Sequence, residues 1–179
     1  MKLTARKVPD AFIQTIPKGF RLIRKKDHDF LLVESLFCPN GHNLIVDSVR
    51  IHDEAAIKLK VVINEESGLL FVDAFWGSHA KLFSFIPKFS SDEPTFVKAY
   101  CPYCNVDLLE RHACAQKGCG SDWSIELILP GGKNKIRVCA KLGCPGHVLD
   151  MIDMPPKVIR SVNVINYFGA GSHDPFGSS

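Results

Sequence analysis

Alternating apolar and polar positions run through most of the chain and predict a mostly β fold. The alternating runs are separated by Gly, Pro, Asn and Ser, which are residues that favour turns. No run keeps a helical period over about ten residues, the length of a usual globular helix, although residues 53–60 could form one short turn of helix. The predicted strands are 30–37, 44–52, 56–63, 68–76, 80–87, 95–100, 124–130, 135–138 and 158–168.

Two pairs of these strands read as hairpins. The first pair is joined through 64–67, and we expect Ser67 and Gly68 to close its turn. The second pair is joined through Gly-Gly-Lys-Asn at 131–134. We therefore expect four parts: an N-terminal segment 1–29, a β-meander 30–110, a hairpin with a final strand 111–168, and a flexible tail rich in Gly and Ser at 169–179.

The cysteines change the picture from a plain β protein to a metal protein. All seven cysteines, together with one histidine, fall into four closely spaced pairs. Two tetrahedral zinc sites need eight ligands in four such pairs, so no cysteine is left over. The predicted zinc ligands are Cys38, His42, Cys101, Cys104, Cys114, Cys119, Cys139 and Cys144.

Each pair also contains a residue that helps the backbone to turn around an ion. Glycine stands immediately before the second ligand in three pairs, at Gly41, Gly118 and Gly143. Glycine tolerates the positive φ angles that such turns need. The fourth pair has Pro102 after its first cysteine, and proline fixes one φ angle in advance.

The second hairpin indicates which pairs share an ion. Cys114/Cys119 precedes its first strand and Cys139/Cys144 follows its second, and an antiparallel hairpin brings these two ends together. Cys38/His42 and Cys101/Cys104 would then form the other site and clamp the ends of the β-meander. The alternative joins Cys101/Cys104 to Cys114/Cys119. His147, in Cys-Pro-Gly-His, could also replace one cysteine of the second site.

The knuckles CPNGH and CPYCNVDLL and the two C-A-x-x-G-C repeats resemble zinc-ribbon modules. This resemblance implies two structural zinc ions. CPYC is also similar to the dithiol site of glutaredoxins, which lies at the start of a helix and early in the chain. Cys139 and Cys144 share part of the spacing of plant-type ferredoxins, but His147 stands where that pattern has a further cysteine. Zinc, thiol redox chemistry and an iron–sulfur cluster therefore all remain open here.

Four protein ligands leave no coordination position for water or substrate, so sites of this kind are structural. The sequence shows no serine–histidine–acid set, phosphate loop or paired carboxylates, which makes an enzyme the less favoured class. We expect a zinc-stabilised interaction protein, a small non-catalytic subunit that docks on a larger enzyme or assembly. Because the N-terminus shows no secretory signal and paired thiols persist in reducing compartments, we expect a cytoplasmic protein without membrane contact.

A nucleic-acid-binding zinc ribbon is the alternative function. A zinc ion with four thiolates carries a charge of −2, and one with three thiolates and a neutral histidine carries −1. Two filled sites would thus cancel the formal charge of +3. Nucleic-acid binding would then depend on local basic patches. The candidates are Arg21, Arg24, Lys25 and Lys26 in one patch and Lys133, Lys135, Arg137 and Lys141 in the other.

Overall fold

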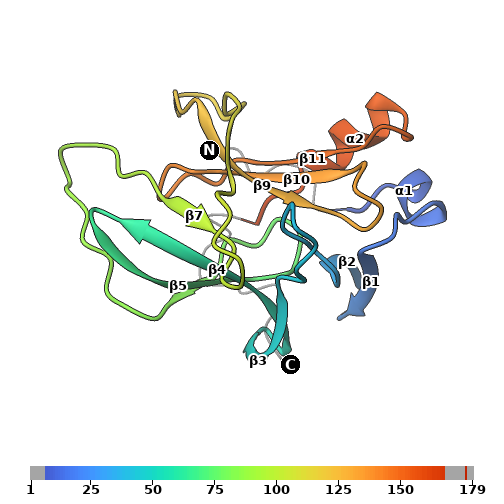
Figure 1. Ribbon diagram of the computed structural model, residues 1–179. Helices are drawn as coiled ribbons and strands as arrows, with labels where there is room; N and C mark the ends of the chain where they lie inside the picture. Colours follow the sequence, from blue (N-terminus) through green and yellow to red (C-terminus); the bar gives the residue numbers. More distant parts are fainter. Residues whose placement is uncertain (1–6, 168–175, 177–179) are drawn as a thin grey trace.

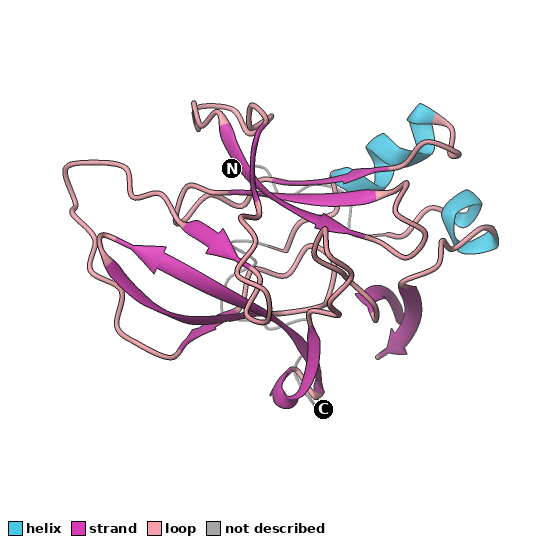
Figure 2. Ribbon diagram, viewed as in Figure 1, coloured by secondary structure: helices cyan, strands magenta, loops and turns pink. Residues whose placement is uncertain are grey.

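The computed structural model describes residues 7–167 and 176 and confirms a mostly β protein (Figure 2). The elements in chain order are α1 (Asp10–Gln14), β1 (Phe20–Lys25), β2 (His28–Val33), β3 (Ile45–Ile51), β4 (Glu54–Ile63), β5 (Glu66–Val72), β6 (Lys81–Phe83), β7 (Lys98–Tyr100), β8 (Leu109–Arg111), β9 (Trp123–Ile128), β10 (Lys135–Cys139), β11 (His147–Asp150) and α2 (Pro156–Asn163).

The strands form three antiparallel sheets. β1 and β2 make a hairpin of their own. A five-stranded sheet has the order β3-β4-β5-β6, with β7 paired to β4. A four-stranded sheet has the order β11-β10-β9-β8. Figure 1 shows the two larger sheets as separate layers, with β4 and β5 in one and β9, β10 and β11 in the other.

A single hydrophobic core joins these sheets, because each strand turns alternate side chains inward. Ile57, Leu59, Val61 and Ile63 of β4 are buried, while the lysines between them lie on the outer face. Leu127 of β9 and Ile136 of β10 belong to the same core. The core therefore depends on both layers, and the segments that cross between them hold the metal clusters described below.

The first hairpin turns at Asn64 and Glu65, three residues before the Ser67 and Gly68 that the sequence predicts. Asn64 and Glu65 both have positive φ angles, 46° and 69°, as in a two-residue type I′ turn. Gly68 instead lies within β5, paired with Val61. A Cβ at Gly68 would overlap the ring of Phe85, so this glycine makes room for an aromatic ring that covers the strand.

Other elements also differ from the prediction. Residues 158–163 of the expected final strand 158–168 belong to α2 instead, and residue 168 lies outside the described ones. The short helical turn considered for 53–60 is wrong, because these residues belong mainly to β4. Strands β1, β8 and β11 were not predicted. The expected flexible tail 169–179 lies outside the described residues except for Phe176, which is buried against Phe30 and Phe75.

Candidate metal centres

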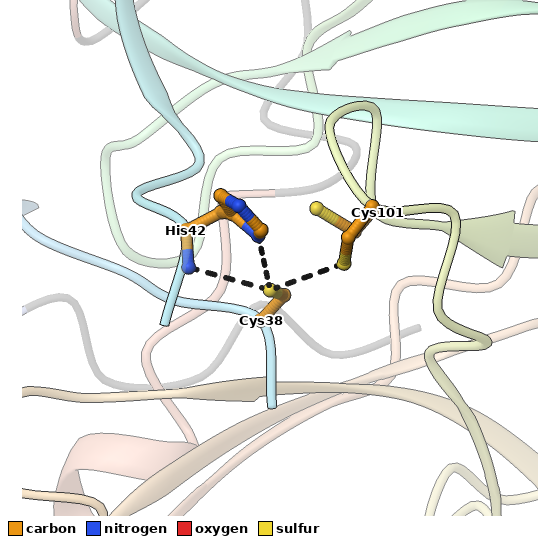
Figure 3. Close-up of side chains that lie close together, drawn as sticks. Cys38, His42 and Cys101 are labelled. Carbon is orange, nitrogen blue, oxygen red and sulfur yellow. Dashed lines mark hydrogen bonds between the residues drawn. The ribbon is translucent and has the colours of Figure 1, made fainter. Parts of the chain in front are cut away.

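The first cluster brings together Cys38, His42, Cys101 and Cys104, whose ligand atoms all lie within 4.8 Å of one another. Sulfur atoms on a tetrahedral zinc ion, each about 2.3 Å from the metal, are about 3.8 Å apart. Cys38 Sγ lies 3.9 Å from Cys104 Sγ and 3.5 Å from His42 Nδ1, which fits such a tetrahedron. Figure 3 shows the side chains of Cys38, His42 and Cys101 pointing toward one another.

The second cluster brings together Cys114, Cys119, Cys139 and Cys144, again with ligand atoms within 4.8 Å of one another. Cys114 Sγ lies 3.8 Å from Cys144 Sγ, and Cys119 Sγ lies 3.6 Å from Cys139 Sγ. These separations are far longer than a disulfide bond of about 2.05 Å, and all seven cysteines are free thiols. The structure therefore groups the eight residues as the hairpin argument predicts, into two clusters that can hold metal ions.

The backbone of each knuckle is shaped for this convergence. Gly41, Gly118 and Gly143 have φ angles of 86°, 81° and 86°, as expected for the residue before the second ligand. In the Cys101–Cys104 knuckle the residue with positive φ is Asn105, at 62°, which follows the second ligand. Asparagine tolerates this conformation better than most residues, so this knuckle needs no glycine.

Backbone N–H groups point at the sulfur atoms in both clusters. Tyr103 N donates to Cys101 Sγ and Gln116 N donates to Cys114 Sγ, each at 3.4 Å. Gly146 N donates to Cys144 Sγ at the same distance. Donors of this kind favour the thiolate form, which is the form that binds metal.

Backbone hydrogen bonds lower the thiol pKa values and burial raises them, and the balance differs from one cysteine to the next. A backbone hydrogen bond from Val106 lowers the pKa of the Cys104 thiol to about 6. Burial raises the pKa of the Cys114 thiol to about 11, and the nearby Cys139 adds to this by charge repulsion. A cation at the centre of the second cluster would offset that repulsion, because its positive charge stabilises the thiolates that coordinate it.

Gly146 is a residue of the second cluster that the sequence argument did not single out. A Cβ at this position would lie 2.6 Å from Cys114 Sγ and 3.4 Å from Cys144 Sγ. Its carbonyl also accepts a hydrogen bond from Cys139 N. Gly146 therefore forms one wall of the cluster, and the only sequence signal for it was its position two residues after a predicted ligand.

His147 does not belong to either cluster. Its Nδ1 lies 3.1 Å from the carbonyl oxygen of Pro145, and its Nε2 lies 2.9 Å from that of Ile165. The ring also packs edge-on against Trp76, with centroids 4.7 Å apart. Both ring nitrogens thus face backbone carbonyls, and His147 joins the second metal cluster to the chain segment that follows α2.

The Cys101–Cys104 pair lies in a turn between β7 and β8, not at the start of a helix. The helical setting that glutaredoxin-like dithiols require is therefore missing at this pair. Both sulfur atoms instead face Cys38 and His42.

Two of the four basic residues in the patch on the second hairpin are paired with acidic side chains. Lys135 Nζ lies 2.8 Å from a carboxylate oxygen of Glu126, and Arg137 Nε lies 3.0 Å from the other. Arg137 also pairs with Asp150 at 2.7 Å. In the N-terminal patch, Arg21 pairs with Glu34 and Glu54.

Comparison with protein-family models, with curated proteins and with solved structures finds no match to this chain. The resemblance to zinc ribbons thus depends on the clusters themselves. Neither helix among the described residues has the length and apolar character that a membrane crossing requires.

Proposed function

We propose that this chain is a zinc-stabilised, non-catalytic interaction protein that docks on a larger enzyme or assembly. The proposal depends on one observation. The eight predicted ligands, which come from four knuckles, form two clusters of four with none left over. A zinc ion with four protein ligands has no position for water or substrate, so its role is to hold the fold.

The donor sets support zinc as the metal. Three cysteines with one histidine, and four cysteines, are the usual ligands of structural zinc. The first cluster joins a knuckle before β3 to a knuckle after β7, which lie more than fifty residues apart in the chain. The second cluster joins the two ends of the β9–β10 hairpin. Each ion therefore links knuckles next to strands that a sheet already brings together, because β3 and β7 both pair with β4 and β9 pairs with β10.

Metal analysis of the purified protein tests this part of the proposal. We expect two zinc ions per chain and no visible absorption from iron. Cys119→Ser should lower the stability of the fold by several kcal/mol, because a structural zinc ion contributes on the order of 10 kcal/mol in small modules. Lys135→Ala, a control in the same hairpin, should cost less than about 1 kcal/mol because it removes only a half-exposed ion pair.

An exposed apolar ridge supports the docking role. It consists of Leu82, Ile86 and Phe89, whose exposed fractions are 49%, 88% and 66%. The segment that carries them is held against β5, since Ser84 N donates to Leu69 O and the Ser84 hydroxyl accepts from Leu69 N. A ridge fixed in this way can enter a partner's groove at little cost in conformational entropy.

Co-purification at fixed stoichiometry from the source organism tests the docking role. We expect the wild-type chain to bring down a defined partner and the double variant Ile86→Asp/Phe89→Asp to lose it, with zinc content unchanged. Ser90→Asp/Ser91→Asp is the matched control, because it adds the same charge to the same segment and leaves the ridge intact. Equal capture by all three proteins would contradict a role for the ridge.

A further inference from the structure

The outer face of the five-stranded sheet carries lysines that belong to neither of the two basic patches described above. Lys58 and Lys60 of β4 alternate with buried residues and so project to the same side. Lys98 of β7 is exposed and pairs in register with Val62, which lies on the same face of β4. We call this surface, together with Tyr100 and Tyr103, the lysine–tyrosine face.

Two tyrosines are interleaved with these lysines. Tyr100 lies directly opposite Lys60 in the β4–β7 pairing. Tyr103, in the first metal knuckle, is 52% exposed, and Lys58 Nζ lies 5.6 Å from its ring centroid. The other ring neighbour of Tyr103 is the metal-cluster residue His42, at 5.7 Å between centroids. The first cluster therefore fixes the position of an exposed aromatic ring beside a row of cations.

The positive charge of the lysines on this face is not neutralised by the neighbouring carboxylates that the structure describes. No carboxylate among the described residues lies within ion-pair distance of these three ammonium groups, whereas Lys135 and Arg137 of the patch on the second hairpin are paired. Lys60 Nζ instead donates to the side-chain oxygen of Asn105, a neutral acceptor. The one nearby acidic residue in the register is Asp107, opposite Tyr100, and its carboxylate already accepts from Leu109 N.

We propose that the lysine–tyrosine face binds single-stranded nucleic acid. Residues two apart on a strand are roughly 6.7 Å apart, a spacing on the order of that between successive phosphates of an extended single strand. The exposed ring of Tyr103, beside the partly exposed Tyr100, is a surface on which an unpaired base can stack, and stacking of this kind tolerates any sequence. An acidic protein surface would also match the lysines, but the repeat of cations along β4 matches the repeat of a nucleic-acid backbone. This inference stands apart from the docking role of the apolar ridge, which lies on β6 and the segment after it.

Fluorescence anisotropy with a labelled single-stranded oligonucleotide tests the proposal on the zinc-loaded protein. We expect binding at low salt that weakens as salt rises, with a slope of log K against log salt of about −2, because three lysines would neutralise about three phosphates at about −0.7 each. Lys58→Ala/Lys60→Ala/Lys98→Ala should abolish most of this slope. Tyr103→Ala should weaken binding by about fivefold or more, through loss of base stacking.

The matched control is Lys18→Ala/Lys117→Ala/Lys157→Ala, which removes the same charge from exposed positions outside the lysine–tyrosine face and outside both basic patches. It should leave the affinity within about twofold, and all variants should retain the zinc content of the wild type. Four results would overturn the proposal: no binding at low salt, equal losses in the two triple variants, tighter binding to duplex than to the single strand, and equal binding of an acidic peptide. The first of these would leave the zinc and docking proposals unaffected, since those are measured by metal content and co-purification.

Discussion

Gly146 shows how one backbone position confines the second metal cluster. Its φ angle lies outside the left-handed region, so alanine would not strain the backbone there. The added methyl group would nevertheless overlap Cys114 Sγ, at 2.6 Å, and the sulfur would have to move. Gly146→Ala should therefore disturb the metal site and leave the local backbone conformation unchanged.

We expect Gly146→Ala to weaken zinc binding by about 10- to 100-fold, the range seen when groups that support metal ligands are changed. Competition with a chromophoric chelator measures this. Gly131→Ala is the control: it has open space around it but a φ of 91°, so it should cost about 1 kcal/mol of stability without changing zinc affinity. Equal zinc affinity in the Gly146 variant and the wild type would show that the cluster can expand.

His79 gives the fold a dependence on pH. Burial, with smaller contributions from His147 and Lys81, lowers its pKa to about 3 from an ordinary value of 6.5. The unfolded chain therefore binds a proton at this residue below about pH 6.5 while the folded chain does not. Stability is fully present above pH 6.5 and falls as the pH drops toward 3, because the unfolded state binds more protons.

When the pH falls from about 7 to about 5, the titration of His79 should lower the free energy of unfolding by about 1–2 kcal/mol. His79→Gln removes the titration and keeps a group that can bond to Asn166. The stability difference between wild type and variant, measured by denaturant unfolding at each pH, isolates His79 because both proteins share the pH dependence of zinc binding. A difference that does not change with pH would rule out a neutral, buried His79.

At the scale of elements, α2 lies where the sequence predicts a strand. The side chain of Asn163, at the end of this helix, forms the hydrogen bonds that a neighbouring strand would form with β11. Its side-chain oxygen accepts from Leu149 N at 2.7 Å and its amide donates to Leu149 O at 3.3 Å. One side chain thus bonds the edge of β11 as a neighbouring strand would. β11 pairs with β10 on its other side, so this contact closes part of an open edge.

Asn163→Ala should destabilise the protein by about 1–3 kcal/mol, since it leaves two backbone groups of Leu149 without partners. Leu149 is fully buried, so water cannot readily replace the lost amide. Ser161→Ala, two residues earlier on the same helix, removes only a bond to Lys157 O and should stay within about 0.5 kcal/mol. Chemical denaturation distinguishes these outcomes, and similar losses in both variants would contradict the role given to Asn163.

The elements that could be predicted from sequence are those whose signal is local. In β4, buried and less buried residues alternate from Ile57 to Ile63. In the knuckles, the ligands are only a few residues apart. The segment 158–168 is rich in Val and Ile, which favour strands, but Pro155 and Pro156 start a helix before it, and residues 158–163 continue that helix. β8 and β11 are only three and four residues long, which is too short for an alternating pattern to be recognised in the sequence. The pairing of the cysteine pairs could be predicted because hairpin geometry decides it, whereas the wall formed by Gly146 depends on tertiary contact.

At the scale of the whole molecule, the two clusters lie at different places relative to the sheets. The first lies at the junction of the two larger sheets: Phe37, just before Cys38, exchanges backbone hydrogen bonds with Ile128 of β9. Leu108, after Cys104, donates to Ala99 O of β7 and accepts from Glu126 N of β9. The second cluster lies mainly within the four-stranded sheet, at the ends of β9 and β10.

Loss of each cluster should therefore loosen different parts of the molecule, and hydrogen exchange can resolve this by segment. In Cys104→Ser we expect faster exchange in both larger sheets, because the crossing at Leu108 loses its anchor. In Cys119→Ser we expect faster exchange in β8 to β11 and in the segment 95–97, which bonds to Ala140, while β4 and β5 stay protected. Exchange that rises equally everywhere in both variants would mean that the shared core makes the two sheets one cooperative unit, with neither cluster acting locally.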